Sequence, residues 1–168
     1  MSNIALTYLE QGNFEEAMEL QLKVLDVLER VLGPDHPHTL NIMATLAVTF
    51  SKQGKYQEAG ELQLTVLDVY NRVLGPEHPC TLTSMASLAA TYSDQGKYEE
   101  AGELRLKVQD LLQKMLGLEH SHTLTSMTIL VTTYSKQEKY DKAEKLLLEM
   151  SNSALLENLA NSREIHGW

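Results

Sequence analysis

Apolar side chains recur every three or four residues along two neighbouring segments, 81–95 and 98–116. This is the spacing of one face of an α-helix. The first stripe is Leu82, Met85, Leu88, Ala89 and Tyr92, and the second is Ala101, Leu104, Val108, Leu111 and Met115. Gly96 lies between the segments, and glycine readily adopts the left-handed conformation that follows many helix ends. The pattern predicts two helices joined by a tight turn.

The same pair of segments recurs at a fixed interval. The motif L-G-P-D-H-P-H-T-L begins at Leu32, L-G-P-E-H-P-C-T-L at Leu74 and L-G-L-E-H-S-H-T-L at Leu116, so both intervals are 42 residues. A second motif, written G-K-Y-E-E-A from Gly96, marks the turn inside each pair and keeps the same interval. A fixed period of this size is typical of repeat solenoids.

The expected fold class is therefore all-α: a right-handed α-solenoid of antiparallel helix pairs. Gly75 and Pro76 follow the second helix of a pair, where glycine and proline commonly stop a helix. Loops this short make neighbouring helices antiparallel. We expect helices at about residues 2–11, 14–32, 39–53, 56–74, 81–95, 98–116, 123–137 and 140–160.

The helix pairs are expected to form one repeat array over residues 1–160, followed by a C-terminal tail, 161–168. Residues 1–12 align with residues 85–96, so the first repeat is expected to be truncated. Trp168, in the tail, receives no role. The predicted repeats are about 1–32, 33–74, 75–116 and 117–160.

The repeats are not identical in sequence. Glu138 replaces the turn glycine in the fourth repeat, where we expect a looser turn. Gly60 and Gly102 lie inside the second helix of their pairs, at positions that Met18 and Glu144 occupy in the other repeats. Because that position accepts long side chains, we expect both glycines to face solvent or a roomy edge, and their replacement by alanine to stabilise the protein.

The composition indicates which classes of partner are disfavoured and in which cellular compartment the protein acts. The chain of 168 residues has a formal net charge of −9, which argues against nucleic acid and anionic membrane surfaces as partners. Cys80 is the single cysteine, as suits a reducing compartment. No apolar run has the length of a membrane span. These features favour a cytoplasmic protein.

The histidines were considered as metal ligands. His36 and His38, like His120 and His122, are separated by one residue, and His78 stands beside Cys80. Zinc would require a tetrahedral ligand set, which no single loop completes. A role at the start of the helix explains the recurrence of His36, His78 and His120, and we expect no metal.

No pattern indicates catalysis or a cofactor. Cys80 lacks an accompanying His/Asp set of its own, and no glycine-rich loop could cradle a phosphate. The carboxylate pairs Glu15/Glu16 and Glu99/Glu100 open helices, where they complement the positive end of the helix dipole. We therefore expect neither an enzyme nor a bound cofactor.

The motifs resemble those of a known family. Leu88, Ala89, Tyr92, Gly96, Tyr98 and Ala101 hold the relative positions of the tetratricopeptide repeat pattern. By period alone HEAT and armadillo arrays compete, but the turn motif favours the tetratricopeptide repeat. The 42-residue form with L-G-x-x-H-P-x-T-L resembles the kinesin light chain type. T-S-M-A-S-L-A-A-T-Y, at residues 83–92, is most similar to versions found in fungal NLR-like proteins.

The resemblance implies a concave groove that takes peptides and is lined by the first helix of each pair. The implied groove is uncharged, unlike the basic groove with which kinesin light chains read Trp-acidic peptides. The chaperone-tail clamp of other tetratricopeptide repeats uses Lys, Arg and Asn at these positions. In this sequence only Asn41 matches that set. These small side chains could alternatively serve only to let helices sit close. The implied groove residues are Asn41, Ala44, Val48, Ser51, Thr83, Ala86, Ala90, Ser93, Thr125, Thr128, Thr132 and Ser135.

The function expected from these observations is a protein–protein interaction module that binds a peptide or helix of a partner protein. It would belong to a larger cytoplasmic scaffold or receptor. Two alternatives remain open: a structural array that self-associates through exposed repeat ends, and a kinesin light chain-like cargo adaptor.

Overall fold

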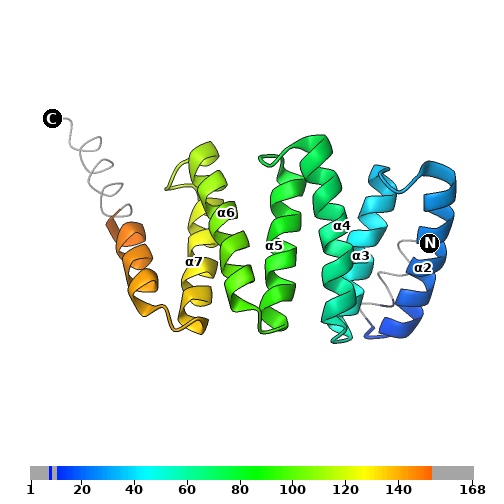
Figure 1. Ribbon diagram of the computed structural model, residues 1–168, viewed down its shortest axis with the longest axis horizontal. Helices are drawn as coiled ribbons and strands as arrows, with labels where there is room; N and C mark the ends of the chain where they lie inside the picture. Colours follow the sequence, from blue (N-terminus) through cyan, green and yellow to red (C-terminus); the bar gives the residue numbers. More distant parts are fainter. Residues whose placement is uncertain (1–7, 9–10, 153–168) are drawn as a thin grey trace. The chain divides into compact units, whose positions relative to one another are not determined.

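The computed structural model describes residue 8 and residues 11–152, all in helices, turns and short loops (Figure 1). The helices are α2 (Phe14–Leu32), α3 (Pro37–Lys52), α4 (Tyr56–Leu74), α5 (Pro79–Asp94), α6 (Tyr98–Leu116) and α7 (Ser121–Lys136), and residues 140–152 are also helical. This part of the chain contains no strand, which confirms the all-α class. Most of the helix expected at 2–11, the end of the one expected at 140–160 and the tail 161–168 with Trp168 lie outside the described residues.

The chain divides into two compact units, one up to Gly96 and one from Lys97. In the first unit, α2 to α5 run alternately in opposite directions and each packs on the next helix in sequence (Figure 1). In the second unit α6 packs on α7. Helix pairs joined by short turns are thus the building element in both units. The predicted repeat boundaries remain a proposal.

Each unit has its own apolar core. In the first unit the core includes Leu25, Leu40, Met43, Leu46, Val66 and Val69. In the second unit Met127 and Leu130 of α7 pack against Leu146 of the helix that follows. The stripe expected on α5 is confirmed, because Leu82, Met85, Leu88 and Ala89 are buried and Tyr92 is half-buried.

The first helix of each pair begins two residues earlier than expected. The reason is the histidine that precedes it, whose Nδ1 accepts a hydrogen bond from a backbone N–H inside the first turn. His36 bonds the N–H of His38, His78 that of Cys80, and His120 that of His122, each at 3.2 Å. A side chain that satisfies a free N–H at a helix start acts as an N-cap. The expected role of these histidines at the helix start is confirmed.

The turn with Glu138 keeps the geometry of its glycine counterparts. Glu138 has a φ of +58°, in the left-handed region, where Gly96 has +77°. The backbone N–H of Glu138 bonds the carbonyl of Ser135 at 3.1 Å, as the N–H of Gly96 bonds that of Ser93 at 3.1 Å. The expectation of a looser turn is therefore wrong. The substitution costs backbone strain instead of changing the turn.

Candidate interaction groove

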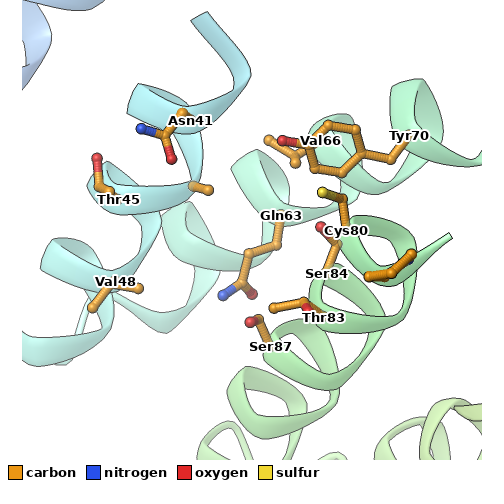
Figure 2. A pocket seen from close by; sticks show the side chains of 12 residues that line it. Asn41, Thr45, Val48, Gln63, Val66, Tyr70, Cys80, Thr83, Ser84 and Ser87 are labelled. Atoms are coloured by element: carbon orange, nitrogen blue, oxygen red, sulfur yellow. The ribbon is translucent and has the colours of Figure 1, made fainter. Parts of the chain in front are cut away.

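A hollow of about 360 Å³ lies between α3, α4 and α5 in the first unit (Figure 2). It is formed by one face of each helix, because the lining positions are three, four or seven residues apart along each chain segment. Helix α3 supplies Asn41, Ala44, Thr45 and Val48; α4 supplies Gln63, Val66 and Tyr70; α5 supplies Pro79, Cys80, Thr83, Ser84 and Ser87.

This hollow, the groove, has two chemically different ends. Val66, Tyr70 and Cys80 gather at one end, the apolar end, as Figure 2 shows. The side-chain amide of Gln63 lies at the other, the polar end, with Thr83 and Ser87. None of the 12 lining side chains is acidic or basic. The groove therefore offers apolar contact and neutral hydrogen-bonding groups, but no ionic partner.

Tyr70 and Cys80 are neighbours from different helices in the apolar end. Burial raises the pKa of the Tyr70 hydroxyl, and the nearby Cys80 thiol raises it further. Loss of the proton would place a charge in a poorly solvated place, so the neutral phenol is favoured. The Tyr70 hydroxyl consequently stays uncharged at neutral pH. The Cys80 side chain beside it is exposed and forms no disulfide.

Gln63 is the one groove residue from α4 whose side chain carries an amide. The residue is 6% exposed. Within the described part of the chain no group donates a hydrogen bond to its Oε1. The equivalent residue one repeat earlier, Gln21, is 3% exposed, and its amide is hydrogen-bonded to the hydroxyl of Thr49 at 2.8 Å. The side-chain Oε1 is therefore hydrogen-bonded inside the protein in one repeat, whereas in the next it is buried without a partner among the described residues.

Comparison with protein families decides the relationship. A family model described as "Tetratricopeptide repeat" matches residues 1–62, 46–104 and 87–152. The chain belongs to the tetratricopeptide repeat family. No curated protein matches it.

Solved structures of tetratricopeptide repeats agree. A candidate kinesin light chain of Podosopora anserina with nearly identical TPR-like repeats is 32% identical, with a TM-score of 0.81, over 89% of this chain and 71% of that one. BtubC (BKLC) from P. vanneervenii has a TM-score of 0.81 at 16% identity, covering 94% and 63% of the two chains. The apo form of RapI has a TM-score of 0.72 at 15% identity, over 88% of this chain and 40% of that one. The last two show the fold alone. The first identifies these repeats as kinesin light chain-like.

Membership of the tetratricopeptide repeat family also gives the broad function. The fold is that of a protein-interaction scaffold and not that of an enzyme family. The chain is thus a protein–protein interaction module built as an α-solenoid of antiparallel helix pairs. The resemblance to fungal NLR-like proteins stays a prediction.

The groove of this tetratricopeptide repeat protein contains four of the twelve residues predicted to line it: Asn41, Ala44, Val48 and Thr83. In the same unit Ala86 and Ala90 are exposed on α5 outside the groove, Ser51 is half-buried, and Ser93 is buried at 7% exposure. The stripe predicted on α5 is therefore rotated relative to the groove wall, which contains Ser84 and Ser87 instead.

The remaining four predicted positions belong to the second unit. Thr125, Thr128, Thr132 and Ser135 are exposed along one side of α7. Each hydroxyl donates to a backbone carbonyl four residues earlier in the helix, at 2.8 to 3.0 Å. Their single donors are thus used within the helix, and the hydroxyl oxygens can only accept further hydrogen bonds.

Sequence reasoning missed the floor of the groove. The second helix of a pair supplies Gln63, Val66 and Tyr70. The family resemblance implies groove residues only on the first helix of each pair. One signal was present: Gln63 is polar at a position of the buried stripe of α4, between Ala59 and Val66. A polar residue in such a stripe needs a hydrogen-bond partner.

Among residues 8 and 11–152, no group of three or more His, Cys, Asp or Glu side chains could hold a metal ion. No helix in that same part of the chain is long and apolar enough to cross a membrane.

Proposed function

We propose that this repeat array binds an extended segment of a partner protein in the groove between α3, α4 and α5. The observation that carries the proposal is the uncharged hollow of about 360 Å³ to which three consecutive helices contribute one face each. Tetratricopeptide repeats are interaction scaffolds, and concave, mostly apolar hollows with a few polar groups are the usual form of binding sites. The array would act as the recognition part of a larger scaffold or receptor.

The class of partner follows from charge. The net charge of −9 and the lack of basic side chains in the groove disfavour nucleic acid, whose binding depends on neutralising phosphates. The same features disfavour anionic membrane surfaces. A protein or peptide is the partner proposed. A single cysteine, free and exposed at Cys80, favours the reducing conditions of the cytoplasm.

A kinesin light chain-like cargo adaptor is a narrower version of the same function. Its support is the similarity to the candidate kinesin light chain of Podosopora anserina. An acidic cargo peptide would gain no ion pair in this groove, because its lining holds no basic side chain. We therefore favour a different, uncharged partner segment.

Two matched substitutions test the proposal. Val48 lines the groove and is 47% exposed, whereas Leu64 of α4 is 46% exposed and does not line it. Proteins captured from cell extract by the immobilised array are identified by mass spectrometry. Val48→Arg should abolish capture of specific partners and Leu64→Arg should not, with unchanged helicity in both. Equal capture by both variants would place the interaction elsewhere.

The predicted positions of the second unit have their own test. Thr128 is exposed on α7, so Thr128→Glu should leave helicity intact and weaken partner binding if the second unit has a binding surface of its own. Loss of helicity would mean that the residue is needed in the core.

Self-association is a second candidate function. It is favoured by Leu147 and Leu148, which are 51% and 57% exposed on the helix of residues 140–152. Exposed apolar side chains of this helix would pair with those of another copy. Light scattering over a hundredfold range of protein concentration separates the two ideas. A monomer at every concentration removes self-association and leaves groove binding unaffected.

A further inference from the structure

We propose that the groove selects an uncharged, extended segment with two features: an apolar side chain for the apolar end, and a backbone amide that hydrogen-bonds to Gln63. The segment would place these features about three residues apart. This inference rests on the proposed function and adds the chemistry of the partner segment.

The first argument is that one polar atom of the groove residues, Oε1 of Gln63, is left unpaired by the described part of the chain. The side chain is at least nine-tenths buried and its Oε1 accepts no hydrogen bond from the described part of the chain. A buried polar atom without a partner is unfavourable, and native proteins rarely retain one without a reason. The Oε1 itself is covered, but Gln63 lines the groove (Figure 2), so a rotation of its amide toward a bound segment would satisfy it.

A peptide backbone suits this amide better than a side chain would. A glutamine amide contains both a donor and an acceptor, and so does each peptide group of an extended segment. The pairing therefore works whichever way the Gln63 amide is turned. A bond to the backbone fixes the register of the segment without demanding a particular side chain at that place.

The second argument is the spacing along α4. Gln63 and Tyr70 are seven residues apart on the same helix, which corresponds to about 10 Å at an α-helical rise of ~1.5 Å per residue. An extended chain rises ~3.3 Å per residue. A segment lying along α4 would therefore span from the amide to the apolar end in about three residues.

The third argument is the absence of charge from the groove lining. A charged side chain that enters a partly closed site loses water, and without an ionic partner this loss is not compensated. An aliphatic or aromatic side chain instead gains contact with Val66 and Tyr70. Selection should thus act against charge as well as in favour of apolar character.

The first experiment uses a phage-displayed library of random 12-residue peptides, selected on the intact protein. Enriched peptides should share one large apolar residue and lack charged residues within about three positions of it. Enrichment of acidic or basic residues at those positions would overturn the inference.

The second experiment measures the affinity of a synthetic, fluorescently labelled peptide of the enriched sequence. Gln63→Leu should weaken binding about tenfold, the value of one hydrogen bond of ordinary strength, and Gln63→Met should act in the same way. The matched control is Gln21→Leu, which changes the equivalent residue one repeat earlier and should leave affinity unchanged. Unchanged affinity in both Gln63 variants would overturn the role of Gln63.

The third measurement locates the peptide. Cys80 is the single cysteine of the chain and lines the groove, so its alkylation by N-ethylmaleimide reports on occupancy. Saturating peptide should slow this reaction at least tenfold. A peptide that binds without protecting Cys80, or a library that yields no peptide, would contradict the proposed function itself. Protection of Cys80 by a charged peptide would contradict only the inference.

Discussion

The side-chain Nε2 of Gln95, at the end of α5, donates a hydrogen bond to the backbone carbonyl of Tyr56, at the start of α4, at 2.6 Å. The second unit contains the same link between Gln137, after α7, and the carbonyl of Tyr98, at the start of α6. Each link ties the end of one helix to the start of the helix before it. The glutamine that precedes the turn is thus a contact between repeats as well as a turn residue.

These links explain the glycines inside α4 and α6. A Cβ at Gly60 would lie 3.4 Å from Nε2 of Gln95, and a Cβ at Gly102 only 2.6 Å from Nε2 of Gln137. Both glycines are buried, so the expectation that they face solvent is wrong. The equivalent residues have different surroundings: the Met18 sulfur lies 3.8 Å from the Lys55 ammonium, and Glu144 is exposed.

Alanine should therefore have different effects at the two glycines. Gly60→Ala keeps ordinary contact with Gln95 and should stabilise the protein by up to about 1 kcal/mol through helix propensity. Gly102→Ala must displace the Gln137 amide, and the loss of its hydrogen bond, worth about 1 kcal/mol, should cancel the gain. Chemical denaturation of the two variants measures the difference.

A double variant provides the control for this prediction. In a Gln137→Ala background there is no amide to displace, so Gly102→Ala should then stabilise by about 1 kcal/mol. Equal effects of alanine at Gly60 and Gly102 in the parent protein would show that the glutamine contact does not restrict the site.

Threonines at the third position after each histidine cap offer another internal comparison. The hydroxyl of Thr81 donates to the carbonyl of Gly75 at 2.7 Å, whereas the buried hydroxyl of Thr123 has no partner in the described residues. Thr81→Val should cost about 1–2 kcal/mol, because it removes a hydrogen bond and leaves a carbonyl unpaired. Thr123→Val should be neutral or stabilising. Thermal unfolding of both variants tests the contrast, and a larger loss at Thr123 would contradict it.

Local signals in the sequence predicted most of the fold. The expected bounds 14–32, 56–74 and 98–116 agree with α2, α4 and α6, because a glycine directly follows each of those helices. The starts of α3, α5 and α7 were missed by two residues. A role at the helix start was expected for these histidines, but histidine is not among the preferred N-cap residues, so the exact start was fixed only by the bond between its Nδ1 and a backbone N–H.

The groove was less predictable, because it depends on how helices are rotated against one another. Whether Ala86 or Ser87 faces α3 is decided by a rotation of α5 that periodicity does not specify, and the structure places Ser87 in the groove. The state of Gln63 likewise depends on tertiary contacts. Its repeat counterpart Gln21 is paired with Thr49, so the two glutamines look equivalent in sequence and differ only in the folded protein.

The histidine caps should contribute measurably to stability. His78→Ala removes the acceptor for the Cys80 N–H at 3.2 Å and should cost about 1 kcal/mol, the usual effect of losing an N-cap. His78→Asn supplies another good capping acceptor and should restore most of that loss. Chemical denaturation distinguishes these outcomes. Equal destabilisation by alanine and asparagine would indicate that the imidazole acts through packing and not through its Nδ1.

The last prediction concerns Glu138, the one residue other than glycine with positive φ in the described part of the chain. A left-handed conformation costs an ordinary residue about 1–2 kcal/mol, whereas glycine adopts it freely at the expense of a more flexible unfolded chain, which costs about 0.4–1 kcal/mol. Glu138→Gly should therefore stabilise the protein by up to about 1 kcal/mol. The matched control is Gly96→Ala in the equivalent turn, at φ +77°, which should destabilise by a similar amount although a Cβ there would meet no atom within 4 Å. Urea unfolding of both variants measures the two effects. Destabilisation by Glu138→Gly would mean that the Glu138 side chain makes a compensating interaction that outweighs the strain of its backbone.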